Sequence, residues 1–253
     1  MTFSVASTLL GTAQVRTRTP DGRRRASHSM EAVLAEAVAL LDESGESALT
    51  FRALAARLGG GVASIYWYVA SKDELLDRAT DHAIGGVLAA VEHQSGEVDR
   101  DGGDPVDVLR TMAVTLFDAI VARPWLTAYF MRNTILQTNS LRLYEQFGRQ
   151  TLRLDLTARQ RFHAVSAILG VVIGTADLGQ EPPAEVLDGR VDRAQYLDRV
   201  AQSWRDVDAA DFPFLHEIVE EFAVHDDLDQ FRAALDLTLA GLRQQTAAGA
   251  AEA

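Results

Sequence analysis

Hydrophobic residues recur at helical spacing over the first part of the chain. From Ser29 onward they fall three or four residues apart, which predicts a helix with Ser29 as its N-cap and Gly45 just past its end. After Thr50, the next N-cap, Leu54 and Leu58 lie on one face of a second helix of about two turns. The pattern therefore predicts two consecutive helices, the second of them short.

A glycine turn and a third helix follow. Gly59–Gly61 predicts the turn, because glycine accepts the left-handed backbone geometry that ends a helix and redirects the chain. The third helix is predicted to start near Val62 and to use Ile65 as its apolar anchor. The aromatic residues that it carries are Tyr66, Trp67 and Tyr68. Two short helices joined by a tight glycine-containing turn are typical of a helix-turn-helix.

The fourth helix has the clearest start signal. Ser71 and Glu74 have the S-x-x-E spacing of a capping box, in which each side chain bonds to the backbone N–H of the other. A helix is therefore predicted from Lys72 to about Glu92. A lysine in the first turn opposes the helix dipole, so a group outside the protein, such as a phosphate, would account for it.

The rest of the chain also has helical periodicity throughout. The segment Ser95–Asp104 is acidic and rich in glycine, which predicts a loop. Helices are predicted at Pro105–Ala122, Pro124–Asn133, Ser140–Leu154, Ala158–Leu178, Ala184–Val207, Pro213–Ala223 and Leu228–Gln245. The predicted fold class is all-α.

Composition narrows the class of protein. The chain has 253 residues, is 47% hydrophobic and contains no cysteine, so we expect a folded globular protein in a reducing cytoplasm, without disulfides or thiolate metal sites. The first fifteen residues have no basic segment, so a secretion signal is not predicted. The longest apolar run, Ala164–Ala176, is shorter than the ~20 residues of a membrane span, so no membrane association is expected.

The basic residues are concentrated near the start of the chain. The formal net charge is −12, yet five arginines and one aspartate lie between Arg16 and His28. An acidic protein can use such an arm to contact phosphates. The alternative is a solvated terminus in which the arginines cluster by chance.

Motifs of enzymes are missing from the sequence. It contains no H-E-x-x-H, G-x-S-x-G or G-x-x-x-x-G-K-[ST] pattern, so an enzyme is not predicted. His225, Asp226 and Asp227 are adjacent and fit an exposed turn better than a metal site, so neither a metal nor a cofactor is expected. A helical adaptor that uses its aromatic residues to bind another protein remains the rival hypothesis.

The segment Leu49–Leu76 resembles the DNA-binding domain of TetR-type (tetracycline-repressor-like) transcriptional regulators. The similarity rests on A-x-x-L-G, I-Y-W-Y and S-K-D-E-L-L, and it extends without a gap from about Met30. It implies three N-terminal helices that bind DNA, a connecting helix, and a larger helical domain that dimerises and binds a small molecule. The expected function is a homodimeric repressor, which a small organic inducer releases from operator DNA read in major grooves about 34 Å apart.

The resemblance also implies domain limits and DNA-binding residues. We expect a flexible basic arm at 1–28, a DNA-binding domain at 29–76 with the connecting helix to about residue 93, a ligand-binding and dimerisation domain at 105–245, and a flexible tail at 246–253. The recognition helix would be Val62–Val69. The residues placed against DNA are Arg52, Ala63, Ser64, Tyr66, Trp67, Tyr68 and Lys72. The alternative for Trp67 or Tyr68 is a mainly structural role.

Three positions depart from the family's pattern. Gly60 and Val69 stand where the family usually has an apolar residue and a phenylalanine, and Phe51 stands where small polar residues are common. The triple glycine affects the entry angle of the recognition helix, and Phe51 affects which bases are read.

Expectations for the second domain concern the ligand and the dimer. Leu88 and a residue near Gly170 stand where tetracycline-binding members have histidines, so magnesium–tetracycline is disfavoured and another organic molecule is expected. Candidate ligand-binding residues are Trp125, Tyr129, Phe130, Arg132, Asn133, Tyr144, Phe147, His163 and Trp204, with an ordinary core role as the alternative for each. Gly170 and Gly174, four residues apart, predict close helix packing, either within one subunit or between Ala158–Leu178 and the last helix of a dimer.

Overall fold

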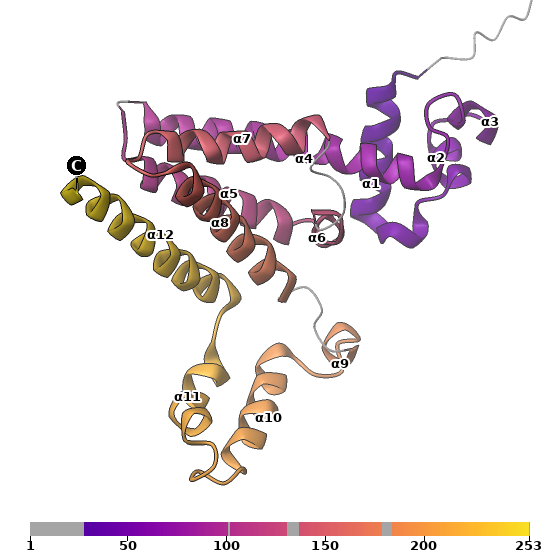
Figure 1. The fold of residues 1–253 in the computed structure, drawn as a ribbon. Helices are drawn as coiled ribbons and strands as arrows, with labels where there is room; N and C mark the ends of the chain where they lie inside the picture. The colour runs from indigo at the N-terminus through magenta and orange to yellow at the C-terminus, as the bar shows by residue number, and fades with distance from the viewer. Residues whose placement is uncertain (1–27, 101, 131–136, 179–183, 253) are drawn as a thin grey trace, which may run out of the picture.

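The computed structural model describes residues 28–100, 102–130, 137–178 and 184–252, and these residues form helices and loops without a strand. Three helices, α1 (Met30–Ala48), α2 (Phe51–Arg57) and α3 (Val62–Ile65), pack around the start of the long helix α4 (Lys72–Asp99). Figure 1 shows this group, hereafter the head, at one end of the molecule. The all-α prediction is confirmed.

The predicted N-caps of the head are confirmed. The side-chain oxygens of Ser29, Thr50 and Ser71 each accept a hydrogen bond at 3.1 Å from the backbone N–H three residues later. These bonds satisfy N–H groups that have no partner inside the helix, so each start is fixed by local sequence. The second bond of the predicted capping box has a different donor. Oε2 of Glu74 accepts from the backbone N–H of Ala70 at 2.7 Å, whereas a capping box would use that of Ser71.

Two helix ends in the head differ from the prediction. Gly45 has φ +69° and lies inside α1, where it produces a kink, and helical structure resumes as far as Ala48. The recognition helix predicted as Val62–Val69 is regular only to Ile65. After it the chain continues in turns, with a bond of 2.9 Å from the Tyr68 N–H to the Ile65 carbonyl. The aromatic residues therefore lie mainly in a turn.

The connecting helix α4 is longer than predicted. It continues to Asp99, so the loop expected at Ser95–Asp104 is confined to the residues after it. The side chain of Arg153 holds this end, because its Nη1 donates to Asp99 Oδ1 at 2.7 Å. Such a contact between distant residues outweighs the low helix propensity of Gly96, which made this stretch resemble a loop.

The second half is a helical bundle beside α4 (Figure 1). Its helices are α5 (Pro105–Val121), α6 (Pro124–Phe130), α7 (Thr138–Leu152), α8 (Ala158–Leu178) and α12 (Asp227–Glu252). Its buried core includes Leu109, Met112 and Phe147, and Phe117 stacks on Phe231 with ring centroids 3.9 Å apart. The helix α12 extends well beyond Gln245 into the segment predicted as a tail, which is rich in helix-forming alanine.

A helical hairpin separates α8 from α12. It contains α9 (Ala184–Leu187), α10 (Arg193–Arg205) and α11 (Pro213–Val224), and it stands away from the bundle in Figure 1. The single helix predicted at Ala184–Val207 is wrong. Gly189, with φ +66°, and the capping box of Asp192 with Gln195 break it in two. Among the helices that the structure describes, none is both long and apolar enough to span a bilayer.

Candidate DNA-binding surface

The head exposes aromatic side chains next to a buried anchor. Trp67 is 88% exposed and Tyr66 is 60% exposed, whereas Ile65 and Val69 on either side are buried in the core. Arg52 of α2 and Ala63 of α3 are also exposed. A short element anchored by Ile65 and Val69 therefore presents its remaining side chains to an outside partner.

Tyr66 is held in place by a neighbour on α2. The ring of Phe51 meets it edge to face, with centroids 4.9 Å apart and an interplanar angle of 83°. This geometry is favourable for aromatic rings because the positive edge of one faces the negative face of the other. Phe51, one of the departures from the family's pattern, thus orients an exposed candidate DNA-binding residue.

Tyr68 and Ser64 are already engaged within the head. Tyr68 is half-buried, and its hydroxyl donates to the carbonyl of His28 at 2.6 Å, which ties the chain just before α1 to the turn after α3. The Ser64 hydroxyl donates to the Gly61 carbonyl at 2.6 Å. Both groups support the local fold, and their predicted contact with DNA stays a prediction.

Lys72 has a partner inside the protein. Its Nζ donates at 3.1 Å to the carbonyl of Glu46, near the C-terminal end of α1, where the helix dipole favours a positive charge. The side chain is nevertheless exposed, so it can still approach a phosphate.

An arginine joins α2 to α1. The Arg57 guanidinium donates to both oxygens of Glu43, at 2.6 and 3.0 Å, and to Glu36. These hydrogen bonds hold the pKa of the Glu43 carboxyl below its usual value and raise the pKa of Arg57. Sequence periodicity gave no signal for this cluster, because its members lie on two helices and Arg57 is 21 residues from Glu36.

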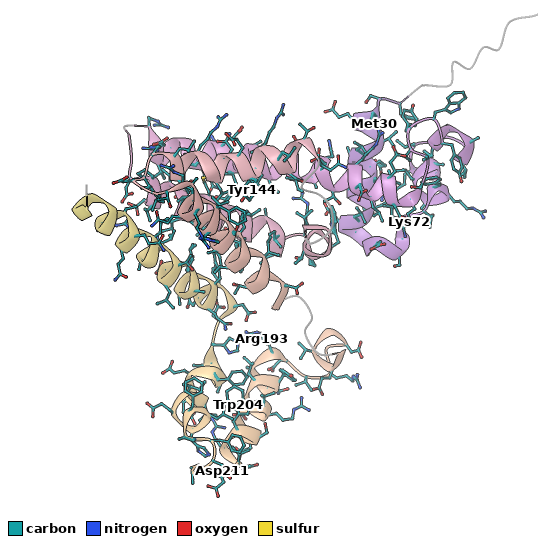
Figure 2. All side chains as sticks on the ribbon, in the orientation of Figure 1. Met30, Lys72, Tyr144, Arg193, Trp204 and Asp211 are labelled. Carbon is teal, nitrogen blue, oxygen red and sulfur yellow. The ribbon has the colours of Figure 1, made fainter. Side chains whose placement is uncertain are left out.

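Those predicted ligand-binding residues that the structure describes do not lie together in one site. Phe147 is fully buried in the bundle core, and Tyr144 is an exposed residue of α7. Figure 2 shows Trp204 in the hairpin, well away from Tyr144. Its indole stacks on Phe222 there, with centroids 4.1 Å apart. These residues have separate structural surroundings.

The other ligand-site candidates are also dispersed. Trp125 is half-buried, and its Nε1 donates to Asp42 of the head at 2.7 Å. His163 is exposed beside a groove between α8 and α12. Arg132 and Asn133 lie outside the described residues, as do the side chains of Tyr129 and Phe130 and the basic arm before His28.

The helices α8 and α12 share an exposed face. Gly170 and Gly174 are exposed, and a side chain added at either would have no atom within 4 Å, so they do not pack against another helix in the described part of the chain. Phe162 of α8 is 59% exposed and Leu237 of α12 is 78% exposed. Apolar residues and small residues on one outer face are typical of a subunit contact.

These features define a class of protein: an all-helical, helix-turn-helix DNA-binding regulator with a separate helical domain. Comparison with known families agrees. Residues 33–79 match the model of bacterial regulatory proteins of the tetR family, and residues 99–246 match the tetracyclin repressor-like C-terminal domain. The second match alone covers more than half of the chain. The chain belongs to the TetR family of transcriptional regulators.

Individual relatives are consistent with this assignment. A transcriptional regulator from Saccharopolyspora erythraea is 34% identical over 113 residues, which are 45% of this chain and 44% of that protein, so the match spans less than half of that relative. The transcriptional repressor DrrR1 of Streptomyces coeruleorubidus is 26% identical over 235 residues, which are 89% of this chain and 81% of that protein.

Solved structures share the fold. The regulator SCO7222 of Streptomyces coelicolor, a TetR, is 33% identical with a TM-score of 0.71, over 87% of this chain and 99% of that one. ActR of the same organism, solved in complex with actinorhodin, is 23% identical with a TM-score of 0.71, over 87% and 98% of the two chains. The likeness to ActR establishes the fold only.

Proposed function

We propose that this regulator is a homodimeric repressor that binds a near-palindromic operator and is released from it by a small organic molecule. The observation that carries the proposal is the exposed pair Tyr66 and Trp67 beside the buried anchor Ile65. Aromatic rings can press on sugars and thymine methyl groups, and the exposed Arg52 can bond to a guanine edge or a phosphate. A chromosomal operator would place the protein in the cytoplasm.

The outer face of α8 and α12 supports a homodimer. Isologous packing of this face would bury Phe162 and Leu237 and bring Gly170 and Gly174 against a partner helix. Two heads related by twofold symmetry would then read two half-sites about one helical turn apart. The geometry of the operator follows directly from that symmetry.

Repression and release by a ligand rest on the relatives. DrrR1 is named a repressor, and ActR is solved in complex with actinorhodin. We propose the same mode of regulation here, with an organic ligand bound in the bundle half. Its binding would favour a head arrangement that no longer fits the operator.

In vitro selection of random double-stranded DNA by the purified protein tests the proposal. We expect enrichment of a near-palindromic sequence, bound far more tightly than unrelated DNA and with an affinity that falls steeply as salt is added. Tyr66→Ala and Trp67→Ala should each weaken binding to the selected duplex. Phe214→Ala, which removes a ring that is 69% exposed on the remote hairpin, is the matched control and should bind normally.

Two outcomes would contradict the proposal. Selection that enriches no sequence would argue against an operator-binding role and in favour of the helical adaptor. Enrichment without an effect of either aromatic substitution would leave a DNA-binding protein but remove the proposed reading surface.

A further inference from the structure

The helix α7 begins without a cap of its own. Its N-cap residue, Gln137, makes no side-chain capping bond, so the first N–H groups of the helix need another acceptor. Asp81 of the connecting helix α4 provides it. Its Oδ1 accepts from the backbone N–H of Asn139 at 2.9 Å and from that of Ser140 at 3.2 Å. A negative charge at this end is also favoured by the dipole of α7.

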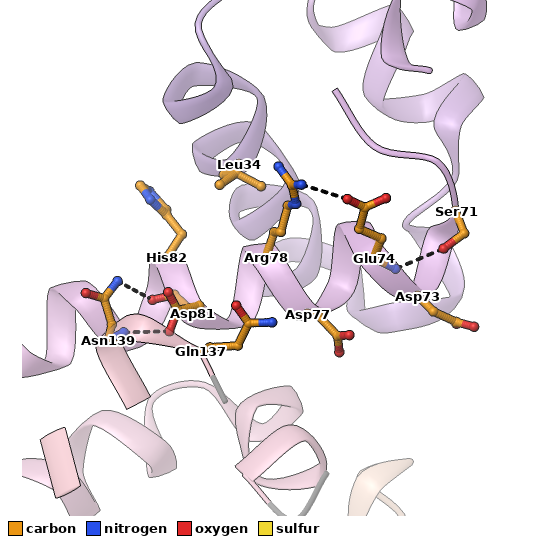
Figure 3. A pocket seen from close by; sticks show the side chains of 10 residues that line it. All are labelled: Leu34, Ser71, Asp73, Glu74, Asp77, Arg78, Asp81, His82, Gln137 and Asn139. Atoms are coloured by element: carbon orange, nitrogen blue, oxygen red, sulfur yellow. Dashed lines mark hydrogen bonds and ion pairs between the residues drawn. The ribbon is translucent and has the colours of Figure 1, made fainter. Parts of the chain in front are cut away.

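The same two residues are joined by a second bond. The side-chain Nδ2 of Asn139 donates to the backbone carbonyl of Asp81 at 2.9 Å (Figure 3). Gly85, one turn further along α4, makes room for it, since a Cβ there would lie only 2.9 Å from Asn139 Nδ2. Asp81 and Asn139 thus form a paired contact, hereafter the α4–α7 latch.

Two buried hydroxyls without partners flank the latch. Among the described residues, the buried side-chain oxygens that lack a hydrogen bond are those of Thr80 and Ser140. Each neighbours a latch residue in the chain. Leaving such a group unpaired costs free energy. At the junction of α4 and α7, the polar groups of Asp81 are therefore hydrogen-bonded, whereas the two hydroxyls beside the latch are not. An arrangement of α4 against α7 that pairs these hydroxyls would recover that free energy.

The latch lies where it can control the head. Leu75, Leu76 and Ala79, in the first turns of α4, are buried in the core that α4 shares with the head. Because α4 is a single helix of 28 residues, roughly 42 Å long, a change of its direction at Asp81 moves the head with it. The cavity in Figure 3 adjoins the latch, since Asp77 and Asp81 of α4 and Asn139 of α7 are among the residues that line it.

We propose that Asp81 is a positioning residue for operator binding, which fixes the direction of α4, and hence of the head, by capping α7. The inference rests on the proposed function. It adds the contact that holds the head in the position in which it binds DNA. Asp81 itself lies behind the reading surface and contacts no DNA in this scheme. Weakening the latch should lower specific affinity because fewer molecules hold both heads in register.

The test compares four variants on the selected operator duplex. Asp81→Ala should weaken specific binding about tenfold, within the usual range of coupling between sites. Asp81→Asn should weaken it less, since its amide oxygen still accepts. Asn139→Ala removes only the second bond and should also have a smaller effect. Asp77→Ala, one turn away on the same helix and the same cavity wall, is the control and should bind within about twofold of the unsubstituted protein.

A direct measurement of head position separates this role from a general loss of stability. Since the chain has no cysteine, Ser44→Cys in the head and Arg142→Cys on α7 can carry spin labels, both at exposed positions. Dilution with unlabelled protein restricts the measured distances to pairs within one chain. The distance distribution should broaden or shift in Asp81→Ala and Asp81→Asn, and should not change in Asp77→Ala.

The outcomes are distinguishable. Normal operator affinity and unchanged label distances in folded Asp81→Ala and Asp81→Asn would overturn the inference while the proposed function stands. Equal losses of specific and non-specific affinity without a distance change would also overturn it, because they indicate only a structural role. If no operator is enriched, the proposed function fails, and the label distances still decide whether Asp81 positions the head.

Discussion

Trp125 and Asp42 connect the bundle to the head, because the indole Nε1 of Trp125 donates to Asp42 Oδ1 at 2.7 Å. Arg123 adds a bond of 3.2 Å to the other oxygen of the same carboxylate. The start of α6 is therefore fastened to α1. Trp125, expected to line a ligand site, has a clear structural role at the boundary between the two halves.

Trp125→Phe should destabilise the protein modestly. The substitution keeps an aromatic ring but removes the N–H donor, and a bond to a charged acceptor contributes about 1.5 kcal/mol. Urea unfolding should show this loss. Trp204→Phe is the control, because its stacking on Phe222 persists. An equal loss in both variants would show that the bond to Asp42 is not the cause.

Tyr68→Phe separates a structural from a DNA-binding role. Loss of the hydroxyl leaves the His28 carbonyl without its donor, so we expect the free energy of unfolding to fall by about 1 kcal/mol. Affinity for the selected operator should change little, since the hydroxyl is already used. A large loss of affinity with normal stability would instead assign Tyr68 to the DNA contact.

The contact between Arg57 and Glu43 predicts a pH dependence. Because the pKa of Glu43 is lowered in the folded protein, its stabilising effect is complete above the ordinary value of 4.5 and is lost as the pH falls through the folded value. The difference in stability between the unsubstituted protein and Glu43→Gln should therefore be largest near neutral pH and shrink below about pH 4.5. Chemical unfolding across a pH series measures it. Glu97→Gln, which makes the same change at an exposed position on α4, is the control.

Gly85 and Gly86 offer a matched pair on α4. A methyl group at Gly86 meets no atom within 4 Å, so Gly86→Ala should stabilise the helix by about 1 kcal/mol. Gly85→Ala has the same helix propensity but must displace the Asn139 amide. It should gain less stability and weaken operator binding. Thermal unfolding and binding assays test both, and identical behaviour would count against the close approach at Gly85.

Leu237→Asp should prevent dimerisation. A charge in the centre of the proposed α8 and α12 interface would be buried without a partner, which is strongly unfavourable. Light scattering after gel filtration should show a monomer for Leu237→Asp. Phe214→Asp, which places the same charge on the exposed hairpin, should leave the mass unchanged. A dimer in both cases would locate the interface elsewhere.

Local signals in the sequence predicted the helix starts well. Ser29, Thr50 and Ser71 each bond to an N–H three residues later, so a short window of sequence contains both partners. Ile65, predicted as the core anchor on the side of the recognition helix opposite the aromatic residues, is buried. The sequence does not decide whether Trp67 or Tyr68 is structural. Neighbouring residues point to different sides of a helix, and the pattern does not give the orientation of so short a helix.

Contacts between distant residues explain what the sequence did not predict. The bond from Trp125 to Asp42 spans 83 residues, and that from Asn139 to Asp81 spans 58. Both carboxylates lie on helices whose polar positions look like ordinary solvent-facing residues. The same reason explains the length of α4, since Asp99 is held by Arg153, 54 residues away.

The hairpin of α10 and α11 packs chiefly on itself, with Leu197, Ala201 and Val219 as a small core of its own. Arg193 joins it to the start of α12 through the His225 carbonyl and Asp227, at 2.9 and 2.7 Å. Such a unit can open and close without unfolding its neighbours. Its amide protons should therefore exchange with solvent earlier than those of the bundle, and its sequence is free to diverge without disturbing the core that supports the head.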